Sequence, residues 1–203
     1  MKIALIDYGS GNLRSVQKAL EACGAEATLA STPEALGNAD AIVVPGVGAF
    51  GDCASNLAKT GLWDPIKSWV AADRPYLGIC LGYQLLFESS EENPGVAGLG
   101  AFRGTVKRFP SGIEKIPHMG WQELAVRTPG AGLYAGLTRP PSVYFVHSYF
   151  PAPADSSLVS ATCDYIEPFA ASISCGRVHA TQYHPEKSQS TGLAILSNFL
   201  KSI

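Results

Sequence analysis

In the first half of the chain, short apolar runs alternate with segments in which apolar residues recur at helical spacing. One such segment places Leu13, Val16 and Leu20 on one face, and further helical segments lie at 33–36, 54–60 and 65–72. The apolar runs have the length of buried strands and lie at 2–7, 25–30, 40–44 and 76–79. Strands that alternate with helices form parallel sheets, so the pattern predicts a doubly wound, flavodoxin-like α/β fold with a mostly parallel sheet and ligands at the carboxyl ends of its strands.

After about residue 94 the pattern changes to short stretches of alternating apolar and polar residues, which predict an antiparallel extension in the C-terminal half. The segment 110–121 is loop-like and carries Trp121, so we expect a contact surface there. The Pro/Gly-rich stretch 128–141 is typical of a surface excursion, and a last helix is expected at 191–203. We therefore expect residues 1–203 to form one domain. The predicted strands of the extension lie at 102–109, 121–126, 143–150, 158–163, 170–175 and 177–183.

Composition narrows the class of protein. Of the 203 residues, 46% are apolar and 16% are charged, and the charged share is low against an average of about 25%. This balance favours a compact, enzyme-sized chain with extensive burial or a subunit interface. The formal charge of −2 offers no basic surface for nucleic acid. The chain begins directly with a predicted strand and has no long apolar run, so we expect neither a signal peptide nor a membrane span.

The cysteines indicate a reduced compartment. They form an odd set, at positions 23, 53, 80, 163 and 175, with no Cys-x-x-Cys pair and no spacing typical of metal ligands. We therefore expect a cytoplasmic protein with no disulfide framework and no metal site.

One cysteine has a distinctive position. Cys80 lies between Gly78 and Gly82, where the strand pattern of 76–79 changes to the helical spacing of Leu81 and the leucines after it. Such a corner is typical of a nucleophile elbow, in which a sharp turn exposes the side chain above a helix N-terminus. The helix N-terminus favours a thiolate and offers N–H groups to an oxyanion. The alternative is a buried structural cysteine, which is common in protein interiors.

A cysteine nucleophile needs a base, and the base needs an orienting acceptor. His184 ends the predicted strand 177–183, and Pro185 favours an extended backbone before it, so its side chain and that of Glu186 point to the same side. The carboxylate can then fix the tautomer of the imidazole. His147 is a second candidate base without a neighbouring carboxylate, and His179 lies within the strand, where a structural or exposed role is expected.

Two glycine-rich turns follow predicted strands. The turn Gly9-Ser10-Gly11 lacks the third glycine of a dinucleotide fingerprint, so a tight loop is favoured over nucleotide binding. The turn Pro45-Gly46-Val47-Gly48 has a backbone that can point N–H groups at a ligand, although a turn without function has the same composition.

Together, the segments 78–84 and 183–186 resemble the class I (triad) glutamine amidotransferases, whose Cys-His-Glu residues hydrolyse glutamine to glutamate and ammonia. The sequence also resembles, over essentially its whole length, a narrower family: the glutaminase subunits of imidazole glycerol phosphate synthase, in histidine biosynthesis. Five motifs in this order carry the narrower resemblance: Asp7-Tyr8-Gly9-Ser10-Gly11-Asn12-Leu13, Pro45-Gly46-Val47-Gly48-Ala49-Phe50, Pro117-His118-Met119-Gly120-Trp121, the segment 144–149 and the segment 184–189.

The resemblance implies a role for each matching residue. Cys80 would form a γ-glutamyl thioester, His184 would be the acid/base and Glu186 its orienter, while the N–H groups of Val47 and Leu81 would bind the oxyanion. No cofactor is implied. The residues implied to contact glutamine are Gly46, Gly48, Gln84, His147, Ser148 and Tyr149.

The same resemblance implies a partner. A cyclase subunit with a (β/α)8 barrel would receive the ammonia in a heterodimer, facing Ser10, Asn12, Trp121 and Lys187. We expect docking of this subunit to set the orientation of the turn at Val47.

The chain departs from the family in two places beside the site: Tyr83 where methionine is frequent, and Tyr183 where phenylalanine is frequent. Alternative interpretations are another triad amidotransferase, a γ-glutamyl hydrolase or a binding subunit without catalysis. The intact set of Cys80, His184 and Glu186 disfavours the last of these.

Overall fold

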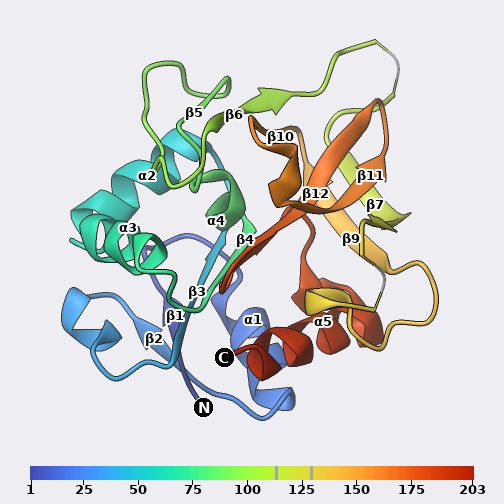
Figure 1. Ribbon diagram of the computed structural model, residues 1–203. Coiled ribbons are helices and arrows are strands. Elements are labelled where there is room, and N and C mark those ends of the chain that lie inside the picture. Colours follow the sequence, from blue (N-terminus) through green and yellow to red (C-terminus); the bar gives the residue numbers. More distant parts are fainter. Residues whose placement is uncertain (113, 129) are drawn as a thin grey trace.

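A twisted sheet of eight strands runs through the computed structural model, which describes residues 1–112, 114–128 and 130–203 (Figure 1). The order across the sheet is β2-β1-β3-β4-β13-β12-β11-β8. The first five strands are parallel: β2 (Glu26–Ala30), β1 (Lys2–Ile6), β3 (Ala41–Gly46), β4 (Tyr76–Cys80) and β13 (Val178–Thr181). The other three continue antiparallel: β12 (Pro168–Cys175), β11 (Val159–Asp164) and β8 (Ala125–Val126). The predicted α/β class with an antiparallel extension is confirmed.

Helices cover both faces of the sheet (Figure 1). The crossover from β1 to β2 and the crossover from β3 to β4 run in opposite directions along the sheet, so right-handed connections place their helices on opposite faces. The first crossover carries α1 (Leu13–Ala22), which packs with α5 (Gln189–Lys201). The second carries α2 (Phe50–Lys59) and α3 (Trp63–Ala71), and α4 (Leu81–Gln84) follows β4. Short 3₁₀ turns lie at η1 (Pro33–Leu36), η2 (Gly132–Tyr134), η3 (Ser156–Leu158) and η4 (Pro185–Lys187).

Two small sheets complete the described part of the chain. One has the order β10 (Tyr149–Pro153), β6 (Gly104–Arg108) and β5 (Ser89–Ser90), and the other pairs β7 (His118–Glu123) with β9 (Ser142–His147). The predicted strand 143–150 is therefore two strands, which separate at Ser148 and join different sheets.

The structure corrects three predictions of detail. The strand predicted at 177–183 pairs parallel with β4, so it belongs to the parallel part of the sheet. Only its pairing with β12, on the other side, is antiparallel. Strand β7 begins at His118, inside the segment 110–121 that was predicted to be a loop. The helix after Cys80 ends at Gln84, because the next turn tightens to bonds three residues back. Residues 113 and 129, in the predicted loop 110–121 and excursion 128–141, lie outside the described residues.

The strand order places the candidate site. Strands β1 and β3 are neighbours, yet the chain leaves β1 toward β2 before returning to β3, so their carboxyl ends flank a topological switch point. In register, Gly46 at the end of β3 lies opposite Cys80 at the end of β4, and Thr181 at the end of β13 lies opposite Ile79. The loops after β1, β3, β4 and β13 therefore meet at one edge of the sheet.

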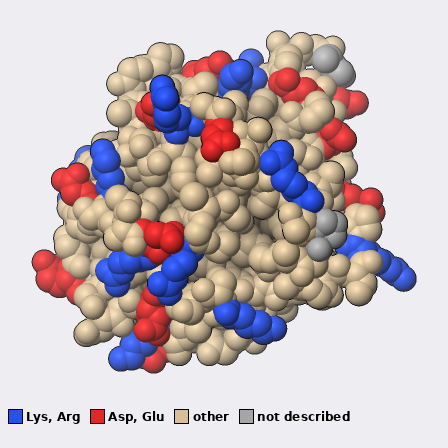
Figure 2. Space-filling view, viewed as in Figure 1, with Lys and Arg blue, Asp and Glu red and all other residues tan. Residues whose placement is uncertain are grey.

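The surface carries charges of both signs. Figure 2 shows Lys and Arg interspersed with Asp and Glu on the face it presents, without a broad region of one sign. Among the described residues, no helix combines the length and the apolar character needed to cross a membrane.

The contact between α4 and β3 yields a stability prediction. A Cβ atom on Gly82 would overlap the carbonyl oxygen of Val44, so Gly82→Ala must push the helix from the strand. We expect it to lower the free energy of unfolding by at least about 2 kcal/mol, measured by urea denaturation. Gly37→Ala is the control, because the position is exposed and its backbone (φ −57°, ψ −33°) is one that alanine adopts, and its added Cβ would only touch the Glu34 carbonyl oxygen, at 3.3 Å. Its effect should stay within about 0.5 kcal/mol. Equal effects for the two variants would contradict the packing argument.

Candidate active site

Cys80 occupies a sharp corner between β4 and α4. Its backbone has φ 55° and ψ −104°, a conformation that residues with a side chain seldom adopt. The corner needs glycine on both sides: a Cβ on Gly78 would lie 2.6 Å from the carbonyl oxygen of Gly82, and one on Gly82 would overlap β3. The Tyr76 hydroxyl donates to the Gly82 carbonyl at 2.8 Å and braces the turn. The structure therefore contains the elbow geometry that the sequence predicted.

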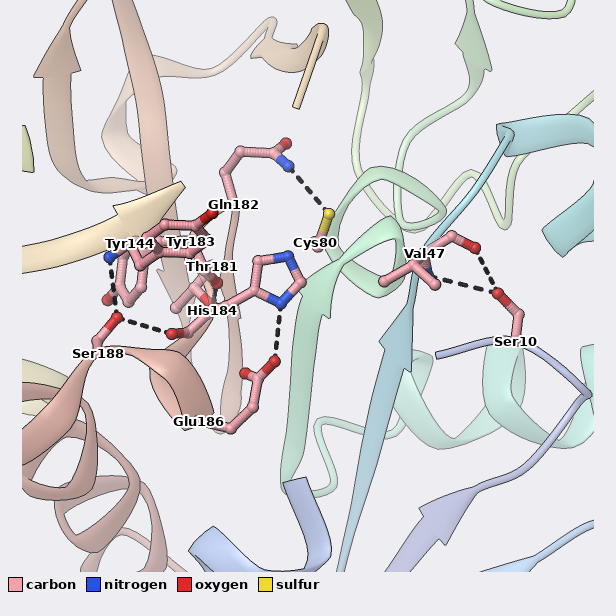
Figure 3. Close-up of polar contacts among 10 residues, drawn as sticks. All are labelled: Ser10, Val47, Cys80, Tyr144, Thr181, Gln182, Tyr183, His184, Glu186 and Ser188. Atoms are coloured by element: carbon pink, nitrogen blue, oxygen red, sulfur yellow. Dashed lines mark hydrogen bonds and ion pairs between the residues drawn. The ribbon is translucent and has the colours of Figure 1, made fainter. Parts of the chain in front are cut away.

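His184 and Glu186 approach this corner from the loop after β13. The Nδ1 atom of His184 lies 2.8 Å from Oε1 of Glu186, and Figure 3 shows the imidazole between Glu186 and Cys80. Two bonds fix the backbone of His184: its N–H donates to the Tyr144 carbonyl at 3.0 Å, and its carbonyl accepts from the Ser188 hydroxyl at 2.7 Å. The same hydroxyl accepts from the Tyr144 N–H at 3.0 Å, which ties the loop to β9.

The surroundings of His184 favour its protonated form. Burial by itself lowers the pKa of this imidazole, but the neighbouring Cys80 thiol and Glu186 carboxylate outweigh burial and raise the pKa to about 10. The Glu186 side chain is 1% exposed, so the carboxylate acts on the ring with little solvent screening. The Nε2 atom of His184 is buried without a hydrogen-bond partner among the described residues. The arrangement is suited to an imidazolium that holds a proton beside the sulfur.

A cavity of about 380 Å³ opens above Cys80. Of the residues expected to contact a substrate, Gly48, Gln84, His147, Ser148 and Tyr149 line it. Gly46 does not, because it lies behind the wall, packed against Tyr8 and Leu81. Lys187, predicted at a partner interface, also reaches the rim of the cavity. The described residues that line the cavity are Val47, Gly48, Cys80, Leu81, Gln84, Glu92, Pro117, Val146, His147, Ser148, Tyr149, His184 and Lys187.

The turn at Val47 is held away from the sulfur. The Val47 N–H points to Oγ of Ser10 at 3.4 Å, and the Ser10 hydroxyl donates to the Val47 carbonyl, so one side chain bridges both polar groups of this residue (Figure 3). The Cys53 thiol also lies 3.6 Å from the same carbonyl. In this arrangement the Val47 N–H is engaged by Ser10 and is not directed at Cys80.

Two residues near the site were not found by sequence reasoning. Glu92 lines the cavity while one carboxylate oxygen accepts from the Phe50 N–H, at the start of α2, at 2.8 Å. Gln182 is fully buried and its Nε2 lies 3.5 Å from Sγ of Cys80 (Figure 3). No local sequence pattern indicates a site residue at either position. Glu92 contacts α2 only in the folded chain, and Gln182 lies within an apolar strand region.

His147 has both ring nitrogens engaged. Its Nδ1 lies 2.8 Å from the Tyr149 carbonyl, which only accepts, so Nδ1 carries the proton. Its Nε2 lies 3.2 Å from Nδ1 of His118, which must then be the donor. Burial lowers the pKa of His147 to about 3 and that of His118 to about 4, so both rings are neutral near pH 7. His147 therefore has no free lone pair with which to act as a base.

The remaining histidine is remote from the thiol. Nδ1 of His179 lies 2.9 Å from Oγ of Ser174 on the neighbouring strand, and its ring packs edge-on against Phe199 of α5. Within residues 1–112, 114–128 and 130–203, no group of three or more His, Cys, Asp and Glu side chains is placed to hold a metal ion.

The two tyrosines at which the chain departs from the family are both bonded. The Tyr183 hydroxyl lies 3.0 Å from that of Tyr134, and the Tyr83 hydroxyl donates to the Ala170 carbonyl at 3.4 Å. Both side chains are fully buried, so these hydroxyl groups are accommodated without loss of packing.

The fold and the arrangement of Cys80, His184 and Glu186 define a class of enzyme. The family model "Glutamine amidotransferase class-I" matches residues 4–203, and the chain belongs to this family of glutamine amidotransferases. Within it the chain falls among the HisH subunits of imidazole glycerol phosphate synthase. A relative from Syntrophotalea carbinolica with that name is 49% identical over 203 residues, covering 97% of this chain and 98% of its own length. One from Methylococcus capsulatus is 48% identical, covering 98% of this chain and 95% of its own.

Solved structures support the fold. The chain is similar to PurLQS from Thermotoga maritima, with a TM-score of 0.78 and 19% identity over 98% of this chain and 97% of that one. It is also similar to the crystal structure of a glutamine amidotransferase, with a TM-score of 0.74 and 22% identity over 98% and 97% of the two chains. At such identities the likeness shows the fold alone.

The backbone of Cys80 yields a second prediction. Replacing alanine by glycine usually destabilises a folded chain by about 0.5–1 kcal/mol. Glycine has no side chain, however, so it adopts any backbone conformation as readily as the mirror image of that conformation. The mirror image of the φ and ψ of Cys80 is ordinary extended backbone, which glycine adopts freely. We therefore expect Cys80→Gly to be more stable than Cys80→Ala by about 1 kcal/mol. Parallel urea denaturation of the two variants measures the difference. The reverse order of stability would show that the corner is not strained.

Proposed function

We propose that this chain is the glutaminase subunit of an imidazole glycerol phosphate synthase and hydrolyses glutamine to glutamate and ammonia at Cys80. The observation that carries the proposal is the buried imidazole of His184, bonded to Glu186 on one side and facing the Cys80 sulfur on the other, at the floor of a cavity. Residues 1–203 would act as one glutamine amidotransferase domain without a cofactor, in the cytoplasm.

The proposed reaction has two halves. The Cys80 sulfur attacks the carboxamide carbon of glutamine, and the proton held on His184 passes to the leaving nitrogen as the C–N bond breaks and ammonia departs. A water molecule then gives a proton to His184 and attacks the thioester carbon, which releases glutamate and restores Cys80. In both halves the N–H groups of Leu81, at the start of α4, and of Val47 would stabilise the oxyanion, provided that the Val47 peptide turns toward the sulfur.

The amino-acid end of glutamine would lie among the polar groups of the cavity. Oε1 of Gln84 is a buried acceptor without a partner among the described residues, so it suits a donor such as the α-ammonium group. Glu92 adds negative charge to the same wall. Gly48 and the backbone of His147, Ser148 and Tyr149 would complete the contacts.

We further propose that a cyclase subunit with a (β/α)8 barrel docks over the mouth of the cavity and receives the ammonia. Trp121 is 45% exposed and packs edge-on against Tyr144. Nζ of Lys187 lies over the Tyr144 ring, 5.9 Å from its centroid. Exposed aromatic side chains beside a cation are typical of interface anchors. Ser10 and Asn12 would form the other side of this interface.

The roles of Cys80 and His184 are tested by glutamine turnover, measured as glutamate release with and without the cyclase subunit. We expect Cys80→Ser and His184→Ala each to lower kcat by at least about a thousandfold, because members of a triad act as a unit. Cys175→Ser is the matched control, since this exposed thiol does not line the cavity, and it should match the wild type. Turnover near the wild-type rate in either triad variant would refute the assigned roles.

The bridge between Ser10 and Val47 gives a prediction for the free subunit. Removing the hydroxyl releases the Val47 peptide, so Ser10→Ala should raise the kcat of the isolated chain about tenfold, the factor set by one ordinary hydrogen bond. With the cyclase docked, the variant and the wild type should differ little. Ser68→Ala, on the exposed face of α3, is the matched control. If Ser10→Ala leaves the isolated activity unchanged, the hydroxyl does not restrain the turn.

A further inference from the structure

A chain of buried amides connects the substrate cavity to the nucleophile. Gln182 is fully buried just beyond β13, and its Nε2 lies 3.5 Å from Sγ of Cys80. Its Oε1 lies 3.1 Å from Nε2 of Gln84, and that same Nε2 lies 3.1 Å from the Tyr149 carbonyl oxygen. The path from the carbonyl to the sulfur thus runs through two side-chain amides.

The Tyr149 carbonyl fixes the direction of every bond in this path. A carbonyl oxygen only accepts, so the Gln84 atom that faces it must be the NH₂ group. The same NH₂ group faces Gln182, whose near atom must then be its oxygen. The remaining end of Gln182 is therefore its NH₂ group, and a donor, never an acceptor, points at the Cys80 sulfur.

The carbonyl is itself held in place. His147 donates to it from Nδ1 at 2.8 Å, and His118 supports His147 from behind at 3.2 Å. Gln84 is 2% exposed and Gln182 is not exposed at all, so water does not compete for these bonds. A donor that cannot reorient differs from a mobile surface amide, because its dipole stays directed at the sulfur.

We propose that Gln182 is a further catalytic residue, which donates a hydrogen bond to the Cys80 sulfur and stabilises the thiolate before attack and after the thioester breaks. This inference rests on the proposed role of Cys80 as the nucleophile. His184 faces the sulfur from another direction (Figure 3), so the thiolate receives one charged donor and one neutral donor. The carboxamide of Gln182 undergoes no covalent change and releases no proton.

The test compares Gln182→Leu and Gln182→Glu with the wild type in the complete subunit. Glutamate retains the shape and the oxygen that accepts from Gln84, but it replaces the donor by an acceptor. The rate of Cys80 alkylation by iodoacetamide is measured between pH 5 and 10 by quantifying the modified peptide. We expect its pH midpoint to rise by about one unit in Gln182→Leu and further in Gln182→Glu, since one unit corresponds to a tenfold change in ionisation. In the glutaminase assay with the cyclase, kcat should fall about tenfold or more while KM changes less than about threefold.

Gln17→Leu is the matched control, because Gln17 donates to the Ala27 carbonyl at 2.8 Å, away from the cavity, and its removal should leave the alkylation profile unchanged. Thermal unfolding checks that each variant is folded. If neither Gln182 variant folds, the same alkylation profile is measured for Gln84→Met, which removes the donor that orients Gln182. Its pH midpoint should then rise as well. If the folded variants keep the wild-type pH midpoint of Cys80 alkylation, the proposed role of Gln182 is refuted and the proposed function is not affected. By contrast, glutamine turnover that survives Cys80→Ser would overturn the proposed function.

Discussion

The backbone corner at Cys80 is the constraint on which the rest of the site depends. A residue with a side chain at φ 55° carries strain of about 1–3 kcal/mol, and it persists only where the surrounding packing leaves no alternative. Here α4 lies so close to β3 that only glycine fits at position 82, and the buried Tyr76 hydroxyl locks the turn. As a consequence, the thiol stands clear of the sheet between the loops that follow β3 and β13. A relaxed corner would return the sulfur to the core and separate it from His184.

Much of the fold could be predicted from the sequence, because the parallel half follows local rules. The period of apolar residues indicated the first four strands, and the glycines on either side of Cys80 indicated the corner. The pairing of β13 with β4 could not be predicted locally, since a strand's own residues do not determine which neighbour it joins. Strand β7 was missed for another reason: Pro117 and Gly120 are typical of loops, but Pro117 directly precedes the strand and Gly120 is accommodated within it at φ 148°.

The residues of the candidate site also divide into those that the sequence could predict and those that it could not. Cys80, His184 and Glu186 could be proposed because each lies in a short motif whose spacing has a chemical meaning. Glu92 and Gln182 have no such motif, and the motif that contains Ser10 does not reveal its contact with Val47. The contacts of all three residues join segments that are distant along the chain. Sequence reasoning placed Ser10 at an interface, but the structure adds that its hydroxyl engages the turn that would bind the oxyanion. The proposed oxyanion site is conditional on that contact: the elbow is complete within this chain, whereas the Val47 N–H would have to leave Ser10 before it could face the sulfur.

The histidines show how environment assigns roles that residue type leaves open. The sequence predicted that His147 and His184 each end a strand, so sequence alone kept each as a possible base; in the structure both line the cavity. Burial lowers the pKa of His147 to about 3, and its two nitrogens are committed to Tyr149 and His118. Burial acts in the same direction on His184, but Glu186 and Cys80 reverse the result and raise the pKa to about 10. The decisive difference is therefore the pair of acidic neighbours, the Cys80 thiol and the Glu186 carboxylate, because together they allow an imidazolium to exist where desolvation alone would forbid it. His147 is instead a neutral ring that fixes the Tyr149 carbonyl, from which the orientations of Gln84 and Gln182 follow.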